Sequence, residues 1–451
     1  MANLTIKNIG PVSTVNISLN KVNIIIGPQS SGKSTICKIA CYCSWVEKRI
    51  CINQSFDDFL EDNFFERELV RFHKMEGYLS DESSFEYESD VLKLSYSHKV
   101  GKPSFEWKDR YGFKRSKIAY IPSERNLVSA IDNWMEVKFR NNNIRNFMVD
   151  WYEARDTYTS SNPLSILDLG VEYYYDENNF GDVVRLKKQE KLIKLTNTSS
   201  GLQSIIPLQS VAEYLSSHIY KAEIPVSISE LSKNQTLASK IFEDKYQASE
   251  ITLPQSGESQ SIYISAEKDI KWELREVKDS DKFTIQKPNK DDSLKIFQSE
   301  EAEQEYQKTI RNFTKIQYTK LFIEEPEQNI FPATQRDLIY YFLELVQRND
   351  LHTLFLTTHS PYIINALNNC LIGYLVQDEI ADDEKEDLKS NASWINPQSV
   401  SVYEVTDSGS LQNIQTERGT ISKHYFNRVM NEILDEYYDM LEFLKPESNE
   451  E

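Results

Sequence analysis

The sequence contains no apolar run long enough to cross a membrane. Its longest apolar runs, such as Val22 to Ile26 and Leu354 to Leu356, are far shorter than the ~20 residues that a membrane-spanning helix needs. The first residues enter a strand pattern at once, without a basic region, an apolar stretch and a small-residue cleavage site. We therefore expect a cytoplasmic protein that makes no membrane contact.

Cysteine and histidine are too sparse, and too poorly spaced, for a structural metal site. Four of the five cysteines, Cys37, Cys41, Cys43 and Cys51, lie close together, but no histidine follows at zinc-ligand spacing. Cys37 and Cys41 are one helical turn apart. We therefore expect small, buried core residues, with metal or redox work as the alternative.

Positive charge is also in short supply, since 51 basic against 70 acidic residues give a net charge of −19. Such a chain repels a nucleic-acid backbone unless cations gather locally. Two basic runs could gather them, although a solvated strand face is the simpler interpretation of each. The runs comprise Lys108, Arg110, Lys114, Arg115 and Lys117, and Arg185, Lys187, Lys188, Lys191 and Lys194. Nucleic-acid binding is therefore allowed but not required.

The hydrophobic pattern predicts an α/β protein. Residues 4 to 26 and 85 to 122 alternate as strands, residues 126 to 168 have a helical pattern, and residues 171 to 195 predict a hairpin with its turn at Asp176 to Asp182.

Strand signals return at Leu321 to Ile323 and at Thr353 to Thr357. The helix Ala333 to Arg348 lies between them, as a parallel αβ unit requires.

Four segments are expected along the chain. Residues 1–215 and 316–420 form the two halves of one core. Residues 216–315 form an inserted α+β or lid subdomain, which includes a polar piece at Gln255 to Gln260 and a charged helix from about 299 to 315. Residues 421–451 comprise a helix and a disordered tail from Pro446.

The end of the chain carries an acidic loop, Asp378 to Asp387, and a long helix, Ile421 to Leu444. Apolar residues follow one side of this helix at spacings of three and four. They are Tyr425, Val429, Ile433, Tyr437, Met440 and Leu444. Packing on the helix's own domain is the simplest interpretation, and partner binding or self-association is the alternative.

A phosphate-binding motif follows the apolar strand at Val22 to Ile26. The pattern G-x-x-x-x-G-K-[ST] lets the backbone curl around phosphate oxygens at a helix N-terminus. Lys33 would reach the β and γ phosphates, and Ser34 would hold Mg²⁺. The predicted ATP-binding residues here are Gly27, Pro28, Gln29, Ser30, Ser31, Gly32, Lys33, Ser34 and Thr35.

Two consecutive carboxylates end the apolar strand at Leu321 to Ile323. A phosphate loop of this kind needs such a strand, because Mg²⁺ takes an outer carboxylate and the attacking water needs a base. We expect Glu324 to hold Mg²⁺ and Glu325 to orient and deprotonate the water. A solvated strand end is the alternative.

In combination these motifs resemble the ABC-type ATPases of the overcoming-lysogenisation-defect group, which are grouped with AAA-family ATPases although they are built like SMC and RecF heads. The resemblance covers about residues 1 to 215 and 315 to 420. It is carried by Asn8 to Pro11, the phosphate loop, Ile121 to Arg125, Ser199 to Gly201, Glu324 to Glu327 with Phe331-Pro332, and Thr358 to Pro361.

The resemblance implies a fold and further site residues. The fold would be an ABC-type head with an antiparallel β subdomain and a helical signature subdomain. His359 would contact the γ-phosphate and sense its loss. Ser199, Ser200, Gly201 and Gln203 would bind the ATP of a facing subunit, so that the site is complete only in a head-to-tail dimer. An ordinary helix cap is the alternative for the Ser-Ser-Gly turn. Ser123 or Glu124 would replace the glutamine that such enzymes place near the metal.

Two departures from the group narrow the expected function. No toprim nuclease domain follows the histidine motif, and no segment is long enough for the coiled coil of SMC proteins. The chain therefore resembles the stand-alone ATPase subunits of bacterial anti-phage systems such as Septu and PARIS, in which a separate nuclease is the effector. The alternative is a RecF- or SMC-like ATPase of DNA repair or DNA-end binding; a transporter subunit fits the helical subdomain poorly.

Overall fold

The structure is a computed structural model. It describes residues 2–131, 133–138, 140–177, 181–221, 227–246, 251–252, 263–265, 273–276, 282–286, 295–297 and 300–443. The polar piece Gln255 to Gln260, Leu444 and the tail from Pro446 lie outside these ranges, as does the middle of the turn between Asp176 and Asp182.

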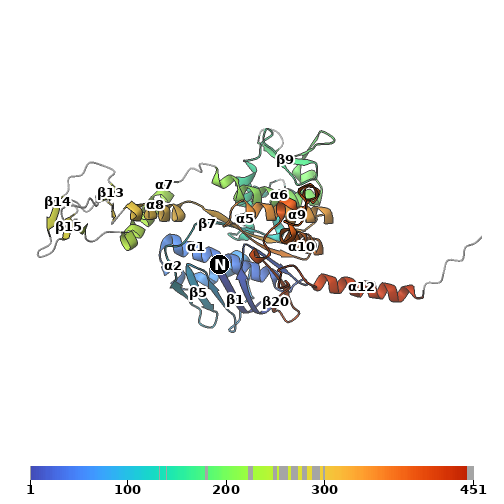
Figure 1. Cartoon of the computed structure of the whole chain (residues 1–451), viewed down its shortest axis with the longest axis horizontal. Helices are drawn as coiled ribbons and strands as arrows, with labels where there is room; N and C mark the ends of the chain where they lie inside the picture. Colours follow the sequence, from blue (N-terminus) through green and yellow to red (C-terminus); the bar gives the residue numbers. More distant parts are fainter. Residues whose placement is uncertain are drawn as a thin grey trace, which may run out of the picture.

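A six-stranded sheet forms the centre of the molecule (Figure 1). Its order is β20 (Leu411–Asn413), β19 (Val400–Val405), β3 (Val22–Ile26), β18 (Thr353–Thr358), β17 (Tyr318–Glu324) and β7 (Ser116–Ile121). All neighbouring strands run parallel except β20, which pairs with β19 in the antiparallel direction. Strands distant in sequence therefore end at one edge, where ligands of open α/β sheets bind.

Both faces of this sheet are buried. Along β17 and β18, Phe322 and Phe355 pack into a hydrophobic cluster on one face, whereas Leu321 and Leu354 join a second cluster on the other. Strands covered on both sides need continuous apolar runs, which explains their strong signal in the sequence.

One face of the sheet carries the β subdomain. It is an antiparallel sheet with the order β2 (Val12–Leu19), β1 (Ala2–Ile9), β4 (Ser84–Glu88), β5 (Leu92–Ser97) and β6 (Pro103–Trp107). The helices of this side are α1 (Lys33–Asn53), α2 (Asp57–Leu60) and α3 (Phe64–His73). The expected antiparallel subdomain is confirmed, but β7, which continues the same strand-like stretch, belongs to the central sheet.

Helices cover the other face. They are α4 (Leu127–Ala130), α5 (Asn143–Arg155), α6 (Ser200–Ser216), α9 (Pro332–Gln347) and α10 (Pro361–Val376). A small sheet lies beside them, with strands β8 (Leu164–Ser165), β9 (Val171–Asp176), β10 (Gly181–Leu186) and β11 (Lys191–Lys194). The expected α/β class is confirmed.

Residues 126 to 168 are only partly helical, so this prediction was too broad. α5 ends at Arg155, and the chain then forms turns and the short strand β8. The hairpin predicted at 171 to 195 has a third strand, β11. Residues Val183 to Leu186 of β10 also pair with Lys191 to Lys194. Short 3-10 helices link the elements, at Ser123–Asn126, Trp134–Glu136, Leu195–Asn197, His218–Tyr220, Asn391–Ser393 and Pro397–Ser399.

The inserted segment is placed mainly by its helices. α7 (Ile228–Ile241), a π-helical turn (Phe242–Tyr246) and α8 (Glu300–Thr314) form a small cluster around Tyr306 and Phe313, which also contains Val91 and Phe113 of the β side. The charged helix expected from about 299 to 315 corresponds to α8. Short strands lie between them: β12 (Ile251–Thr252), β13 (Tyr263–Ser265), β14 (Glu273–Glu276), β15 (Lys282–Gln286) and β16 (Lys295–Phe297).

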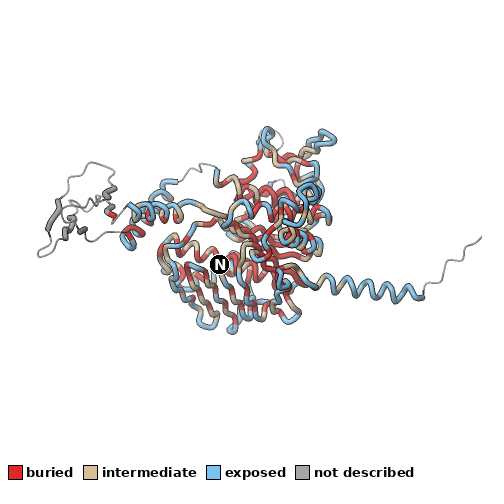
Figure 2. Tube along the Cα trace, viewed as in Figure 1, coloured by how far each residue is buried: buried red, intermediate tan, exposed pale blue. Residues whose placement is uncertain are grey.

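The last elements differ from expectation in two ways. The acidic loop contains a short helix, α11 (Asp382–Glu386). The final helix, α12 (Tyr425–Leu441), begins four residues later than expected, has no buried residue and projects away from the body (Figures 1 and 2). The expected packing on its own domain therefore holds only at its first turn, where Phe426 packs partly against the main hydrophobic cluster. Within the described residues, no helix is both long and apolar enough to span a membrane.

Candidate nucleotide-binding site

The turn between β3 and α1 has the shape that its motif predicts. Gly27 and Gly32 have φ values of +148° and +104°. A Cβ atom on Gly32 would lie 2.7 Å from Cγ2 of Val12, and one on Gly27 would lie 3.1 Å from the Val405 carbonyl oxygen. Glycine is therefore required at both positions for the conformation and for the space. A tight loop that leads into a helix N-terminus favours a bound phosphate.

Lys33 lies inside the curve of this loop. Its ammonium group donates hydrogen bonds to the carbonyl oxygens of Gly27 (3.0 Å) and Pro28 (2.6 Å), and the residue is 5% exposed. Burial lowers the pKa of Lys33 to about 8, although nearby Glu325 and Glu327 favour its charged form.

The phosphate loop also carries hydroxyl and amide side chains. The Ser31 hydroxyl oxygen is buried without a hydrogen-bond partner. Gln29 and Ser30 are exposed at the tip of the loop, and Ser34 is partly exposed on the first turn of α1, whereas the neighbouring Thr35 is buried. The loop therefore has an unpaired hydroxyl oxygen on its inside, that of Ser31, and its tip is open to solvent.

Glu324 ends β17 at the carboxyl edge of the sheet. It is 5% exposed, and its Oε1 atom is buried without a hydrogen-bond partner. Burial raises the pKa of Cys37 on α1 and of Tyr120 on β7, and the charge of Glu324 raises both pKa values further. A buried carboxylate with an unsatisfied oxygen is costly unless a cation or donor joins it.

Glu325 and His359 form a pair across β17 and β18. His359 Nε2 lies 3.3 Å from Glu325 Oε1, and both side chains are about one-third exposed, at 31% and 36%. This contact is the main cause that lowers the pKa of Glu325, with Lys33 and Arg125 contributing by charge. Glu325 also has a positive φ of 44°, an uncommon conformation for a residue with a side chain.

Arg125 holds the Glu325 turn in place, a role that the sequence did not reveal. It is fully buried, and its guanidinium donates to the carbonyl oxygens of Glu324 (2.9 Å) and Glu325 (2.7 Å). Burial lowers the pKa of Arg125 to about 10, although the carboxylates of Glu327, Glu325 and Glu324 oppose this. The side chain thus brings positive charge beneath the paired glutamates.

Glu327 is the second positioning residue that the sequence did not reveal. Its Oε1 accepts a hydrogen bond from the backbone N–H of His359 (2.5 Å), and burial raises its pKa. Arg125 and Glu327 both lie in motifs that carry the family resemblance, but only their burial and their hydrogen-bond partners show what they do.

The serine-glycine turn lies at the start of α6. Ser199 is the N-cap, with its side chain accepting from the Leu202 N–H, and both Ser199 and Ser200 are exposed. A Cβ atom on Gly201 would lie 3.0 Å from the Asn329 carbonyl oxygen. The turn therefore packs against the loop that follows Glu325, next to Phe331, which is 75% exposed.

Two further predicted residues have local partners. The Gln203 side-chain amide donates to the Thr196 carbonyl oxygen (2.8 Å). Ser123 follows β7 at the same edge as Glu324, and its hydroxyl donates to Glu124 (3.3 Å), which also pairs with Lys74 (2.8 Å). Lys74 therefore already occupies one oxygen of the Glu124 carboxylate.

The first basic run is largely neutralised within the fold. Its ion pairs are Lys108 with Glu88 (2.6 Å), Arg110 with Asp244 (3.0 Å), Arg115 with Glu230 (3.1 Å) and Lys117 with Asp150 (2.7 Å). The cysteines are free and buried, as expected, and the described residues contain no cluster of potential metal ligands of the histidine, cysteine and carboxylate kind.

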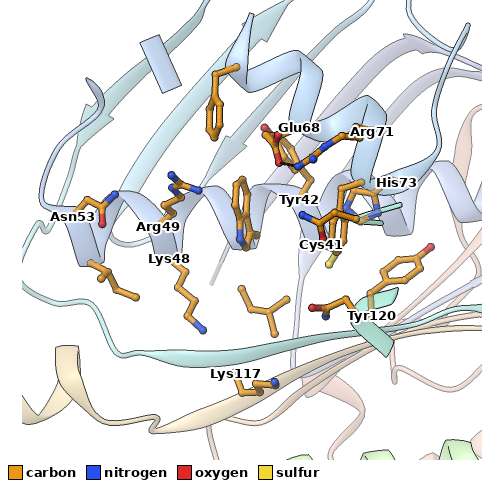
Figure 3. A pocket seen from close by; sticks show the side chains of 17 residues that line it. Cys41, Tyr42, Lys48, Arg49, Asn53, Glu68, Arg71, His73, Lys117 and Tyr120 are labelled. Atoms are coloured by element: carbon orange, nitrogen blue, oxygen red, sulfur yellow. Dashed lines mark hydrogen bonds and ion pairs between the residues drawn. The ribbon is translucent and has the colours of Figure 1, made fainter. Parts of the chain in front are cut away.

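A separate cavity of about 630 Å³ lies between α1, α3 and β7 and shares no lining residue with the phosphate loop (Figure 3). Lys48 points into it and has no hydrogen bond or ion pair within the described part of the chain. Burial lowers the pKa of Lys48 to about 7, and nearby Arg115 and Lys117 lower it further.

Comparison with known proteins gives one family match. Residues 315–364, from just before β17 to the first turn of α10, match the AAA ATPase domain family. No curated protein matches the chain.

Solved structures of nucleotide-binding heads are similar to the chain only distantly. The SMC head domain from Thermotoga maritima is 10% identical, with 92% of this chain and 98% of that chain covered and a TM-score of 0.35. The Smc head domain with an extended coiled coil from Pyrococcus furiosus is 10% identical, with 97% and 100% covered and a TM-score of 0.27. A dimeric ATP-binding cassette bound to ADP and Pi is 11% identical, with 92% and 99% covered and a TM-score of 0.25. At identities and TM-scores this low, the similarity does not show a shared function.

Proposed function

We propose that this chain is an ABC-type ATPase that closes around ATP as a head-to-tail dimer. The observation that carries the proposal is the meeting of Lys33, Glu324, Glu325 and His359 at the carboxyl edge of the central sheet. These residues come from the phosphate loop and from the ends of β17 and β18.

The residues present fit a magnesium-bound triphosphate. The oxygens Ser31 Oγ and Glu324 Oε1 are buried without a hydrogen-bond partner, and the Lys33 ammonium is bonded only to loop carbonyls; ATP and Mg²⁺ would supply the missing partners and an anion for Lys33. Ser34 and Glu324 would hold Mg²⁺, with Ser123 at the same edge. The ion would neutralise negative charge that develops on the phosphates.

The protein's own groups account for the remaining steps. Lys33 would leave the loop carbonyls and bind the terminal phosphates. Glu325 would orient the attacking water and accept its proton, since its lowered pKa keeps it ionised at neutral pH. His359, already within reach of Glu325, would exchange that contact for the γ-phosphate. Arg125 would keep the Glu325 backbone in its positive-φ turn.

The second half of the site would come from another copy. Ser199 and Ser200 are exposed at a helix N-terminus, where hydroxyl and backbone N–H groups favour an anion. Because Gly201 packs on Asn329, the turn and the loop after Glu325 form one continuous surface. An ATP molecule held by Lys33 of one protomer would meet this surface of its partner.

We further propose that the chain is the regulatory or sensor subunit of an anti-phage complex with a separate nuclease. This step is supported by the resemblance of its motifs. The alternative, a DNA-repair ATPase, is less well supported because the cations of the first basic run are paired with carboxylates.

Purified wild-type protein should hydrolyse ATP in the presence of Mg²⁺. Lys33→Ala should lose ATP binding, whereas Glu325→Gln should keep binding and lose at least tenfold in turnover, because only the base is removed. Phosphate release and nucleotide titration measure the two effects. Wild-type turnover by Glu325→Gln would contradict the assigned base.

A further inference from the structure

The cavity between α1, α3 and β7 combines aromatic walls with positive charge (Figure 3). Its aromatic lining includes Trp45 of α1 and Phe64 and Phe72 of α3, and each of these residues is partly exposed. The volume of about 630 Å³ lies within the range of pockets that hold small molecules. The cavity is therefore large enough, and apolar enough in part, to cover an aromatic ring.

The aromatic walls are held in place from beneath. The Tyr42 hydroxyl donates a hydrogen bond to the carbonyl oxygen of Phe65 (2.5 Å), and the Trp45 ring stacks on that of Tyr42 with centroids 5.6 Å apart. The buried His73 ring meets the rings of Tyr42 and Tyr120 edge to face, at 6.3 and 5.3 Å. These contacts form the cavity before any ligand binds.

Cationic side chains outnumber carboxylates in the lining. Four cations line the cavity, whereas Glu68 is the one carboxylate among the lining residues. Three of the four cations are paired: Arg49 with Asp58 (2.9 Å), Arg71 with Glu68 (2.5 Å) and Lys117 with Asp150 (2.7 Å). The fourth, Lys48, has no ion pair or hydrogen bond in the described part of the chain. The fold therefore leaves the charge of Lys48 without a direct partner.

The surroundings of Lys48 favour an incoming anion. Its side chain extends from α1 toward β7, which carries Lys117 (Figure 3). Burial lowers the pKa of Lys48 to about 7, and the charges of Arg115 and Lys117 lower it further, against the opposing effect of Asp150 and Glu230. An anion beside the amine would restore the charged form and gain an ion pair within a partly apolar cavity.

Two amide side chains add hydrogen-bonding groups to the same cavity. Asn141 precedes α5 and Asn146 lies in its first turns, and both line the cavity. Neither side-chain amide has a hydrogen bond within the described ranges. An amide group donates to and accepts from ligand oxygen atoms. Three polar groups from two separate segments thus share one cavity and lack protein partners.

We propose that this cavity binds a small aromatic anion, whose carboxylate or phosphate group pairs with Lys48 and whose ring packs on the aromatic walls. One unpaired cation matches a ligand with one anionic group better than a polyanion such as a nucleic acid. The cavity shares no lining residue with the phosphate loop, so this binding does not depend on the proposed ATPase function.

Acetylation of individual lysines, read by mass spectrometry at pH 7.5, tests the site at Lys48 itself. Acetic anhydride modifies only the uncharged amine. Phenyl phosphate and benzoate are the anionic probes, and benzyl alcohol supplies the ring without the charge. At saturation, at least one anion should slow the acetylation of Lys48 by roughly threefold or more, the effect of a pKa raised by about one unit. Benzyl alcohol should not, and the exposed Lys188 should react equally throughout.

The variant Lys48→Met keeps the apolar stem and removes the charge. It should bind benzoate or phenyl phosphate, whichever protects Lys48, roughly tenfold more weakly in an isothermal titration, because one charged hydrogen-bonding partner is lost. Lys188→Met is the matched control and should bind like wild type. A melting temperature no lower than that of wild type would verify that Lys48→Met folds.

Any of three results would overturn the proposal: no protection of Lys48 by either anion, equal protection by benzyl alcohol, or unchanged affinity in Lys48→Met. A chain that fails to hydrolyse ATP would leave all three measurements as they are, so failure of the ATPase function is distinguishable from failure of this site. Stronger protection by phenyl phosphate than by benzoate, or the reverse, identifies the anionic group that the cavity prefers.

Discussion

Lys33 shows how the fold prepares a single side chain for its ligand. Without nucleotide its ammonium is satisfied only by loop carbonyls, and burial lowers its pKa to about 8. A bound triphosphate would favour the charged form and raise that pKa again. Between the two pKa values the free protein binds fewer protons than the complex, so ATP binding must take up protons near pH 8 and weaken as pH rises above it.

Isothermal titration of Glu325→Gln with ATP at pH 8, in buffers of different ionisation enthalpy, measures this proton uptake directly. We expect a fraction of one proton taken up at pH 8 and a smaller fraction at pH 6.5, where Lys33 is already charged. No proton uptake at pH 8 would mean that Lys33 does not change its protonation on binding.

Arg125 is the second residue with a distinct expected effect. Lysine cannot donate to the carbonyl oxygens of both Glu324 and Glu325 with the geometry of a guanidinium. Arg125→Lys should therefore lower the free energy of unfolding by about 2 kcal/mol and reduce turnover more than ATP binding. Urea unfolding and ATPase kinetics measure the two effects. Arg71→Lys, an exposed member of a surface pair with Glu68, is the control and should change neither.

At the scale of elements, the apolar pattern predicted the buried strands of the central sheet best. A strand that is covered on both faces must be apolar along its whole length. The strands β3, β17 and β18 and the phosphate loop could be located in the sequence because core strands need continuous apolar residues. The sequence predicted that α12 packs on its own domain, and this prediction failed beyond the first turn. Its amphipathic pattern is that of any packed surface helix, and periodicity cannot tell whether the covering surface belongs to the same chain.

The candidate site was predictable only in part. Lys33, Glu324, Glu325 and His359 stand at motif positions, and the parallel order of their strands brings them together. Arg125 and Glu327 were missed because their roles depend on burial and on backbone partners, which no spacing encodes. Whether Ser123 and Gln203 take part remains a prediction.

The serine-glycine turn carries the prediction that belongs to this scale. Because Ser200 is exposed, Ser200→Arg should fold normally and bind ATP, yet its side chain would block the approach of a partner's phosphate. We expect at least a tenfold loss of turnover with unchanged thermal stability. Ser216→Arg is no useful comparison because Ser216 is buried; Ser161→Arg, on an exposed turn, is the control. Equal turnover in both variants would argue against a role for the turn.

At the scale of the whole molecule, the proposed function needs two copies that meet and separate with the nucleotide. Head closure would depend on ATP and would be lost after hydrolysis. Hydrolysis would therefore change the shape of the assembly.

Complementation between two inactive variants tests the central claim most directly. Lys33→Ala removes the phosphate loop of one copy, and Ser200→Arg removes the serine-glycine turn of another. If each site is shared between copies, an equimolar mixture has one intact site in every mixed dimer, and roughly a quarter of wild-type ATPase activity should return. If each site belonged to a single chain, every copy would carry a defect, and the mixture would stay as inactive as its components.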